Sequence, residues 1–267
     1  VAITEHPNDV AQHLEQAYAS GLTRVVSIGG DGTNHCLVNA LADLNQRHPE
    51  GPHMVYGIIP IGTGRDWARA TNIPTGDHRA TAEWIASAEP RPVDLGLVQY
   101  DGKREYFLNI TSLGMGGDVV ERVNSVPVRR PWTFLQATIT TLLRYQPPPI
   151  QVTIDGKTWY DERAFALVVA NGGYFGHGMK IAPDAKYDDG LFDVLVIKKA
   201  SRMKLLAALQ EVYKGTHLTH PAVRHTRGKE VKVHSPTGVI GMELDGEYAA
   251  GRDITLTVHP AALHMLV

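Results

Sequence analysis

The chain has 267 residues, of which 43% are hydrophobic and 20% are charged, so it can bury a core of ordinary size and has room for two domains. Its formal net charge of -2 argues against a nucleic-acid partner, because such a partner would require a basic face. The single cysteine, Cys36, excludes an internal disulfide, and neither a signal-like N-terminus nor a membrane-spanning apolar stretch is present, which together predict a cytoplasmic protein.

The first informative segment is a glycine-rich turn that follows an apolar strand. A helix predicted over residues 10–19 precedes that strand, and the turn consists of Gly29, Gly30, Asp31, Gly32, Thr33 and Asn34. Its glycines have no Cβ atom to keep a phosphate group away from the backbone N–H groups, and a helix predicted over residues 36–44 would point its N-terminal dipole at an anion. The turn therefore predicts a nucleotide-phosphate site.

Asp31 gives this turn a carboxylate. A carboxylate beside phosphate groups is repulsive unless a Mg²⁺ ion lies between them or the carboxylate accepts a proton from the attacking group. The alternative interpretation is an ordinary strand-to-helix turn that Asp31 stabilises.

A second strand, turn and helix follow the same pattern. The strand at residues 57–61 leads into Gly62, Thr63, Gly64, Arg65 and Asp66, with a helix predicted from Trp67 and another at residues 80–87. Turns that end neighbouring parallel strands share the carboxyl edge of a doubly wound sheet, where such folds bind their ligands. Thr63 would supply a hydroxyl group and Arg65 a cation. Asp66 is expected to cap the helix or to pair with Arg65.

The pattern of elements changes near residue 92. Residues 1–91 alternate strands with helices, which predicts a doubly wound, Rossmann-like α/β domain for nucleotide binding. Residues 92–267 carry many short strands, which predicts a β-sandwich-like C-terminal domain for the substrate, with the boundary at Pro90, Arg91 and Pro92. The predicted strands lie at residues 95–99, 106–110, 150–154, 164–170, 192–197, 230–234 and 254–258, and helices are predicted at 132–145 and 201–213.

Five segments, in this order, resemble the bacterial diacylglycerol-kinase-like lipid kinases, which are related to sphingosine and ceramide kinases and share a superfamily with NAD kinases. The segments are GGDGT at 29–33, GTGRD at 62–66, DGLFDV at 189–194, LDGE at 244–247 and PAAL at 260–263. The resemblance covers nearly the whole chain. It implies Mg²⁺-assisted transfer of a phosphoryl group from ATP to a hydroxyl group of diacylglycerol or a similar lipid, in a cleft between the two domains.

The resemblance also implies roles for single residues. Thr4 would lie against the nucleotide, together with the two glycine-rich turns. Asp31 would act near the metal or the attacking hydroxyl group. Glu247 resembles the residue assigned as proton acceptor, with Asp245 in the same turn, and an alcohol is a poor nucleophile that needs such a carboxylate. From the residues alone, a plain hairpin turn at Asp245 and Gly246 is an equally good interpretation.

Asp189 resembles a residue that binds a structural Mg²⁺ ion together with backbone carbonyl groups of the residues that follow it, here around 191–194. One carboxylate and several carbonyl groups are reasonable ligands for a hard cation. The alternative from the residues alone is an Asp-Gly turn that leads into a strand.

The sequence departs from the family pattern in two places. The family usually continues GGDGT with a residue pair ending in glutamate, whereas Asn34, His35 and Cys36 stand here and remove a carboxylate near the phosphates. The chain also opens with what resembles the second strand, so we expect either that the usual first strand and its Asn-Pro motif lie outside the sequence or that a central strand is missing.

The lipid substrate implies contact with a membrane surface, and hence a protein that is peripheral on the inner face of the membrane. Arg129 and Arg130, next to Trp132 and Phe134, are candidates for such contact, and a solvated face is the alternative. A homodimer is compatible with the sequence. Two other functions stay open: an NAD-kinase-like enzyme, and a catalytically inactive regulator that binds lipid or nucleotide.

Overall fold

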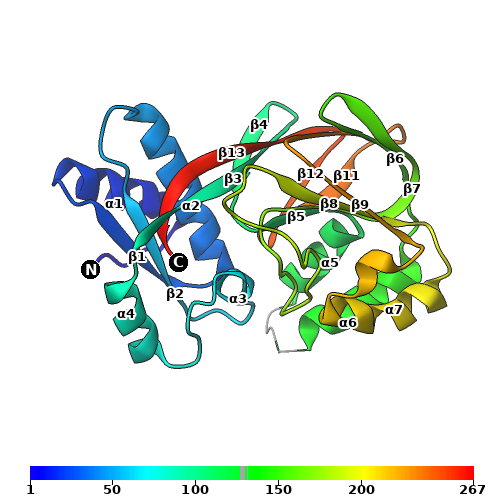
Figure 1. Cartoon of the computed structure of the whole chain (residues 1–267), viewed down its shortest axis with the longest axis horizontal. Coiled ribbons are helices and arrows are strands. Elements are labelled where there is room, and N and C mark those ends of the chain that lie inside the picture. The colour runs from blue at the N-terminus through cyan, green and yellow to red at the C-terminus, as the bar shows by residue number, and fades with distance from the viewer. Residues whose placement is uncertain (127–129, 131) are drawn as a thin grey trace.

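The structure is a computed structural model that describes residues 1–126, 130 and 132–267. Strands and helices alternate in its N-terminal half (Figure 1). Its elements are α1 (Pro7–Ala19), β1 (Arg24–Gly29), α2 (Asp31–Arg47), β2 (Val55–Pro60), α3 (Asp66–Ala70) and α4 (His78–Ser87). β1 and β2 pair in parallel, with Gly29 opposite Pro60. The two glycine-rich turns therefore begin at the same edge of the sheet, as predicted for a doubly wound fold.

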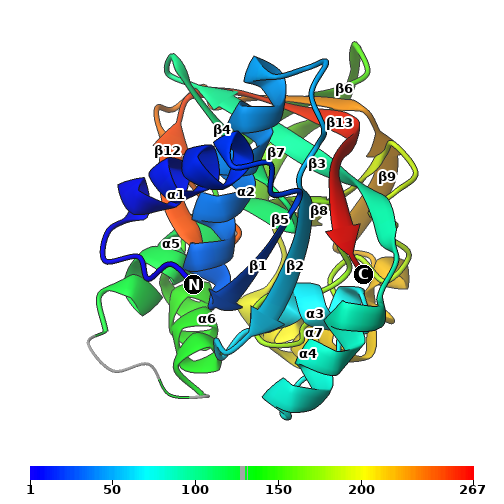
Figure 2. The same cartoon turned by 90° about the vertical axis from the view of Figure 1, so that its left-hand side faces the viewer.

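α2 forms because its apolar residues recur on one face. Leu37, Val38, Leu41 and Leu44 follow the helical spacing of three and four residues, and all are buried. They belong to the core cluster of the N-terminal half, and α1 packs on α2 (Figure 2). This packing fixes the direction of α2, whose N-terminus lies at the strand edge.

The C-terminal half is built from antiparallel strands, as the sequence predicts for a β-sandwich-like domain. The strands are β3 (Pro90–Tyr100), β4 (Lys103–Phe107), β5 (Ile110–Gly114), β6 (Pro149–Ile154), β7 (Lys157–Ala170), β8 (Phe192–Lys198), β9 (Val223–Gly228), β10 (Glu230–His234), β11 (Ile240–Leu244), β12 (Glu247–Gly251) and β13 (Asp253–Leu266). Three of them, β3, β7 and β13, are longer than the short strands predicted. The helices are α5 (Met115–Asn124), α6 (Thr133–Arg144) and α7 (Arg202–Lys214), with a 3₁₀ turn η1 (His217–Thr219). Phe107 and Phe192 stack inside this half, with ring centroids 5.6 Å apart.

A single curled sheet connects the two halves. Its hydrogen-bonded order among the described residues is β1-β2-β13-β10-β6-β7-β5-β11-β12. Off this path, β3 pairs with β13 and β4 with β3, while β8 pairs with β7 and β9 with β8. β13 pairs antiparallel with β3 and, at His264 and Met265, parallel with β2. The long red strand in Figure 1 thus belongs to both halves, and β3 runs through the boundary that the sequence predicts at Pro90 to Pro92.

Several elements differ from the sequence predictions. α2 begins at Asp31 rather than at residue 36, with Gly30 as its N-cap, so the glycine-rich turn supplies the first helical turn. The strand predicted at residues 106–110 is divided between β4 and β5, because the Asp245 side chain accepts hydrogen bonds from the backbone between them.

The helix α5 and the strand β9 were not predicted, and the strands β11 and β12 were predicted only through the hairpin alternative at Asp245 and Gly246. Gly116 and Gly117 stand at the start of α5 although glycine is a poor helix former. A Cβ atom at Gly117 would overlap the backbone of Gly241 on β11, so glycine lets α5 pack directly on that strand. Among the described residues, no helix is both long enough and apolar enough to cross a bilayer.

Candidate active site

The two glycine-rich segments touch each other and line one cleft. A Cβ atom at Gly62 would lie 2.9 Å from the Cα atom of Gly30, so only glycine allows the two backbones to approach this closely. The cleft has a volume of about 380 Å³, within the roughly 300–1,000 Å³ of small-molecule sites. The predicted site residues that line it are Gly30, Asp31, Gly32, Thr33, Asn34, Gly62, Thr63, Asp245 and Glu247.

The N-terminus of α2 forms one wall of this cleft. The helix has 17 residues and begins at Asp31, so Asp31, Gly32 and Thr33 occupy its first turn. The first N–H groups of a helix have no acceptor within the helix, and its dipole is positive at this end. An anion such as a phosphate group is therefore favoured at this wall.

The turn between β11 and β12 forms the opposite wall. Asp245 and Gly246 have φ values of 49° and 94°, the conformation of a tight hairpin turn, so the hairpin interpretation of these residues is correct. The turn also faces the cleft. Glu247 is exposed, and its Oε1 atom lies 2.9 Å from the position that a Cβ atom on Gly32 would take. A carboxylate thus lies against the first turn of α2.

Asp245 and Glu247 lie in different surroundings. The Asp245 carboxylate accepts hydrogen bonds from the N–H groups of Leu108, Asn109 and Ile110 at 2.6, 3.0 and 3.0 Å. Burial raises the pKa of Asp245, while nearby His35 and these three N–H groups act in the opposite direction. Asp245 therefore holds the β4–β5 connection against the hairpin, which fits a positioning role.

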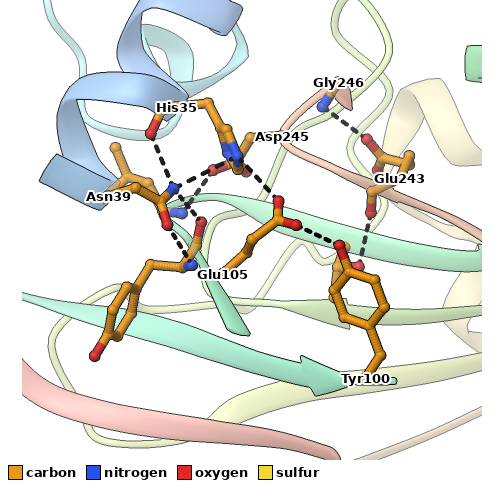
Figure 3. Close-up of polar contacts among 10 residues, drawn as sticks. His35, Asn39, Tyr100, Glu105, Glu243, Asp245 and Gly246 are labelled. Atoms are coloured by element: carbon orange, nitrogen blue, oxygen red, sulfur yellow. Dashed lines mark hydrogen bonds and ion pairs between the residues drawn. The ribbon is translucent and has the colours of Figure 1, made fainter. Parts of the chain in front are cut away.

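A polar network that the sequence did not predict lies beneath this turn (Figure 3). His35 on α2 faces Glu105 on β4, with 3.6 Å between Nε2 and Oε2, and Glu105 also accepts a hydrogen bond from Tyr100. Asn39 ties α2 to β4, because its side chain donates to the carbonyl group of Tyr106 and accepts from the Tyr106 N–H group. The only sequence signal for this network was the unusual His35 itself.

Two opposing effects determine the charge of His35. Burial disfavours the imidazolium, but the hydrogen bond to Glu105 and the carboxylates of Asp245, Glu105 and Glu247 outweigh it, so the pKa of His35 is raised. The same contact with His35 lowers the pKa of Glu105. The pair therefore favours a cation and an anion side by side beneath the cleft.

Asp66 has a different role from the one predicted. Arg65 is the N-cap of α3 and donates to the Gly62 carbonyl group, so Asp66 neither caps the helix nor pairs with Arg65. Its carboxylate accepts from the N–H groups of His177 and Gly178 at 2.9 and 2.8 Å and pairs with Arg69. His177, which the sequence analysis missed, also lies 3.2 Å from the Thr63 hydroxyl group. Asp66 therefore ties a distant loop to the second glycine-rich turn.

Three predicted nucleotide-binding residues do not fit the cleft in the expected way. Thr4 is exposed and, like Gly29, is not among the residues that line the cleft. A Cβ atom at Gly29 would lie 2.7 Å from Thr33 Cβ, so this glycine lets the strand end pack against α2. Asn34 lines the cleft, but its Oδ1 atom accepts from Ser27 and Tyr56 at 2.9 Å each.

Asp189 lies outside the cleft, just before β8. Its carboxylate pairs with Arg227 on β9, which also reaches Asp193 at 3.2 Å, and accepts from the Leu191 N–H group at 3.2 Å. Within the described part of the chain, no three or more His, Cys, Asp or Glu side chains are grouped to hold a metal ion. A site made of one carboxylate and backbone carbonyl groups would not require such a group, so the assignment of Asp189 stays a prediction.

Comparison with known proteins places both halves in one family. The profile described as the diacylglycerol kinase catalytic domain matches residues 1–98, and that of the YegS C-terminal NAD kinase beta sandwich-like domain matches residues 109–267. The chain is 32% identical over 265 residues to a diacylglycerol kinase of Mycobacterium tuberculosis (strain CDC 1551 / Oshkosh), covering 97% of this chain and 81% of the relative. It is 30% identical over 245 residues to a diacylglycerol kinase of Bacillus subtilis (strain 168), covering 90% and 76%.

A solved structure gives the same fold. The crystal structure of a diacylglycerol kinase from Bacillus anthracis str. Sterne superposes with a TM-score of 0.71 at 20% identity, covering 98% of this chain and 82% of that chain. The order of the motifs, the matches of both halves and the similarity to these relatives lead to one conclusion. The chain belongs to the diacylglycerol kinase family of lipid kinases.

Proposed function

We propose that this lipid kinase transfers the γ-phosphoryl group of ATP to a free hydroxyl group of diacylglycerol or a similar neutral lipid. The observation that carries the proposal is the convergence of three features on one cleft: the N-terminus of α2, the second glycine-rich turn and the Glu247 carboxylate. The names of the relatives support the proposed lipid class, and the geometry of the cleft supports the roles that we propose for its residues.

The polyphosphate of ATP would bind at the N-terminus of α2. The glycines at 30, 32 and 62 line the cleft and have no Cβ atom to keep phosphate oxygens away from the backbone N–H groups. Thr63 lines the same cleft, with its hydroxyl group 3.2 Å from His177 Nε2. The electrostatics of a helix N-terminus favour this orientation over one with the adenine ring at the glycine-rich turns.

The donor set of the cleft also fits a Mg²⁺ ion. Mg²⁺ is usually held by one or two carboxylates and by the phosphate oxygens of the substrate rather than by a cage of protein ligands. Asp31 lines the cleft in the first turn of α2 and would be such a carboxylate. When bound, the ion would neutralise negative charge on the phosphate oxygens during transfer.

The reaction would need a base for the lipid hydroxyl group. Glu247 faces the first turn of α2 and would take the hydroxyl proton while the lipid oxygen forms its bond to the γ-phosphorus atom. The bond between the γ-phosphorus atom and the β–γ bridging oxygen breaks, and ADP leaves. Asp245 would keep the hairpin in place, because its carboxylate is anchored to the β4–β5 connection.

The lipid would be taken from a membrane surface. Trp132, Leu135 and Leu143 are exposed on or next to α6, and the Arg130 guanidinium lies 5.5 Å from the Trp132 ring centroid. Aromatic and basic side chains together suit a bilayer interface. Arg129, which the sequence analysis included in this surface, lies outside the described residues. Phe134 is half-buried and lines the cleft.

The proposal is tested by incubating the protein with ATP labelled at the γ-phosphate and with total lipid extract, dioctanoylglycerol or NAD as acceptor. We expect label in a phospholipid product from dioctanoylglycerol, dependent on Mg²⁺. Label in NADP would support the NAD-kinase-like alternative. Nucleotide binding without transfer to any acceptor would support a regulator and would overturn the proposed reaction.

A further inference from the structure

A buried carboxyl group lies where the cleft meets a second, apolar cavity. Glu243 on β11 is only 5% exposed, and it lines both spaces together with Val120, Phe134 and Phe175. The second cavity lies between the sheet and helices α5, α6 and α7, and nearly all of its lining is apolar. The two spaces are therefore neighbours, and Glu243 is a polar group on their common border.

The Glu243 carboxyl group has one satisfied and one unsatisfied oxygen. Its Oε2 atom accepts a hydrogen bond from the Gly246 N–H group at 2.9 Å, as Figure 3 shows. Its Oε1 atom is buried and has no hydrogen-bond partner among the described residues. Because an unpaired buried polar atom costs free energy, such an atom in a residue that lines a cleft indicates a group that pairs with a ligand.

The surroundings of Glu243 favour its neutral form. Burial raises its pKa to about 8, and the carboxylates of Asp245 in the hairpin, Asp66 in α3 and Asp31 in α2 act in the same direction. At neutral pH the group is therefore mostly a carboxylic acid. Since Oε2 already accepts from Gly246, the proton belongs on Oε1, which makes that atom a hydrogen-bond donor without an acceptor.

The ligand group at this position must be an acceptor that lies between a polar and an apolar region. In a diacylglycerol, ester carbonyl groups stand between the free hydroxyl group and the acyl chains, which matches this order. Thr138 also lines the apolar cavity, but its hydroxyl group already donates to the Phe134 carbonyl group at 2.9 Å. Glu243 can thus donate to a lipid without breaking a hydrogen bond within the protein.

We propose that Glu243 is a substrate-binding residue whose carboxyl group donates a hydrogen bond to an ester carbonyl oxygen of the lipid, while the carbons next to that ester enter the apolar cavity, whose volume is about 70 Å³. This inference rests on the proposed lipid kinase function and adds a selection for ester-linked over ether-linked lipids. An ether lipid has no carbonyl oxygen at this position, so the donor would be left unpaired.

The test compares 1,2-dioctanoylglycerol, a diester, with 1,2-dioctylglycerol, the matching diether, and measures kcat and KM for each. We expect the wild type to prefer the diester in kcat/KM by roughly tenfold at pH 7, mainly through KM. Glu243→Gln keeps a donor and should keep the preference. Glu243→Leu should remove the preference. The control Thr138→Val should not change the ratio of kcat/KM for the diester to kcat/KM for the diether.

A pH series keeps the inference testable if Glu243→Leu does not fold. Raising the pH from 7 to 9 ionises Glu243, so the wild type should lose its diester preference while Glu243→Gln, which does not ionise, keeps it. Because kcat/KM for the diester is divided by kcat/KM for the diether at the same pH, the effects of pH on other groups of the site cancel. The inference would be overturned if the ratio of kcat/KM for the diester to that for the diether were unchanged in Glu243→Leu, or in the wild type at pH 9. It would also be overturned if Glu243→Leu raised the KM for ATP and left that ratio unchanged.

Lipid binding separates this inference from the proposed function. The rise in melting temperature with each lipid, in the absence of ATP, reports binding without turnover. Binding that favours the diester in the wild type but not in Glu243→Leu would support the role of Glu243 even if no lipid were phosphorylated, in which case the kinase proposal alone would fail. Equal binding of both lipids by the wild type would overturn the role of Glu243 while leaving the kinase proposal intact.

Discussion

Neighbouring acidic residues at the β11–β12 hairpin differ because their surroundings differ. Asp245 is anchored to three backbone N–H groups, whereas Glu247 is exposed on the cleft side of the same turn. Glu243, on the strand that leads into the turn, is buried and favours its neutral form. Residue type alone does not assign their roles; burial and hydrogen bonding do.

Replacing Asp245 by alanine should destabilise the fold. The substitution leaves the N–H groups of Leu108, Asn109 and Ile110 without their acceptor. Because each unpaired buried donor costs about 1–3 kcal/mol, we expect the free energy of unfolding to fall by about 3 kcal/mol or more. Urea unfolding measures the change, and the exposed Asp161→Ala serves as a control that should change it by less than about 0.5 kcal/mol. A loss no greater than that of the control would contradict the positioning role.

His35 should make the stability of the protein depend on pH. Its folded pKa is raised above the ordinary value of about 6.5. The contribution of the charged form is therefore fully present below about pH 6.5 and is lost as the pH rises through the folded pKa. The difference in unfolding free energy between the wild type and His35→Gln should be largest near pH 6 and should shrink toward pH 9.

Urea unfolding at several pH values measures that difference. The control is His78→Gln, which changes an exposed residue in the first turn of α4. A difference between the wild type and His35→Gln that grows with pH would contradict the favoured cation beside Glu105.

At the scale of elements, the glycine-rich turns were predictable because their chemistry is local. Their glycine spacing and the preceding apolar strands are sequence features, and the structure places both turns on one cleft. The break between β4 and β5 was not predictable, because Asp245, which causes it, is 137 residues away from Leu108. The start of α5 was not predictable for a similar reason, because Gly117 serves its packing on β11, which is more than 100 residues away in the sequence.

The residues of the site also fall into those that a sequence motif predicts and those that only the fold brings together. Glu247 and Asp245 could be named because a family motif carries them, while Glu105 and His177 come from segments with no motif and meet the site only in the folded chain. Thr4, which the motif also suggested, does not line the cleft. Contacts between elements that are distant in sequence therefore set the limit of what the sequence predicts.

The loop before β8 offers a test at the scale of one element. If Asp189 binds Mg²⁺ with nearby carbonyl groups, the ion stabilises the folded state by mass action, and millimolar Mg²⁺ should raise the melting temperature. Asp189→Asn should remove that response. Arg227→Gln removes the partner that pairs with Asp189 and should strengthen the response, because the carboxylate is then available to the cation. An equal response to Mg²⁺ in the wild type and in Asp189→Asn would show that the carboxylate acts only through Arg227.

At the scale of the whole molecule, β13 makes the two halves depend on each other. It pairs with β2 in the N-terminal half and with β3 and β10 in the same continuous sheet. Met265, near its end, is fully buried in the core cluster of the N-terminal half. The loss of packing at this one strand should therefore affect both halves.

Met265→Ala should lower the free energy of unfolding by about 2–5 kcal/mol, the usual cost of such a truncation in a core. Both halves should still unfold in one transition. Fluorescence of variants that retain only Trp67, in the N-terminal half, or only Trp159, in the C-terminal half, reports each half separately. Coincident transitions would support the dependence. A Trp67 signal that changes at a lower urea concentration than the Trp159 signal would contradict it.

The central claim is that the cleft transfers phosphate with Glu247 as the base. Glu247→Gln keeps the shape and the hydrogen-bonding reach of the side chain but removes its basicity. The most direct measurement is the ATP affinity and the turnover of dioctanoylglycerol by this variant, with Glu162→Gln on the exposed part of β7 as the matched control. We expect ATP affinity to stay within about twofold while turnover falls by roughly 10²- to 10⁴-fold. Wild-type turnover in Glu247→Gln, or a parallel loss of ATP affinity and turnover, would contradict the account.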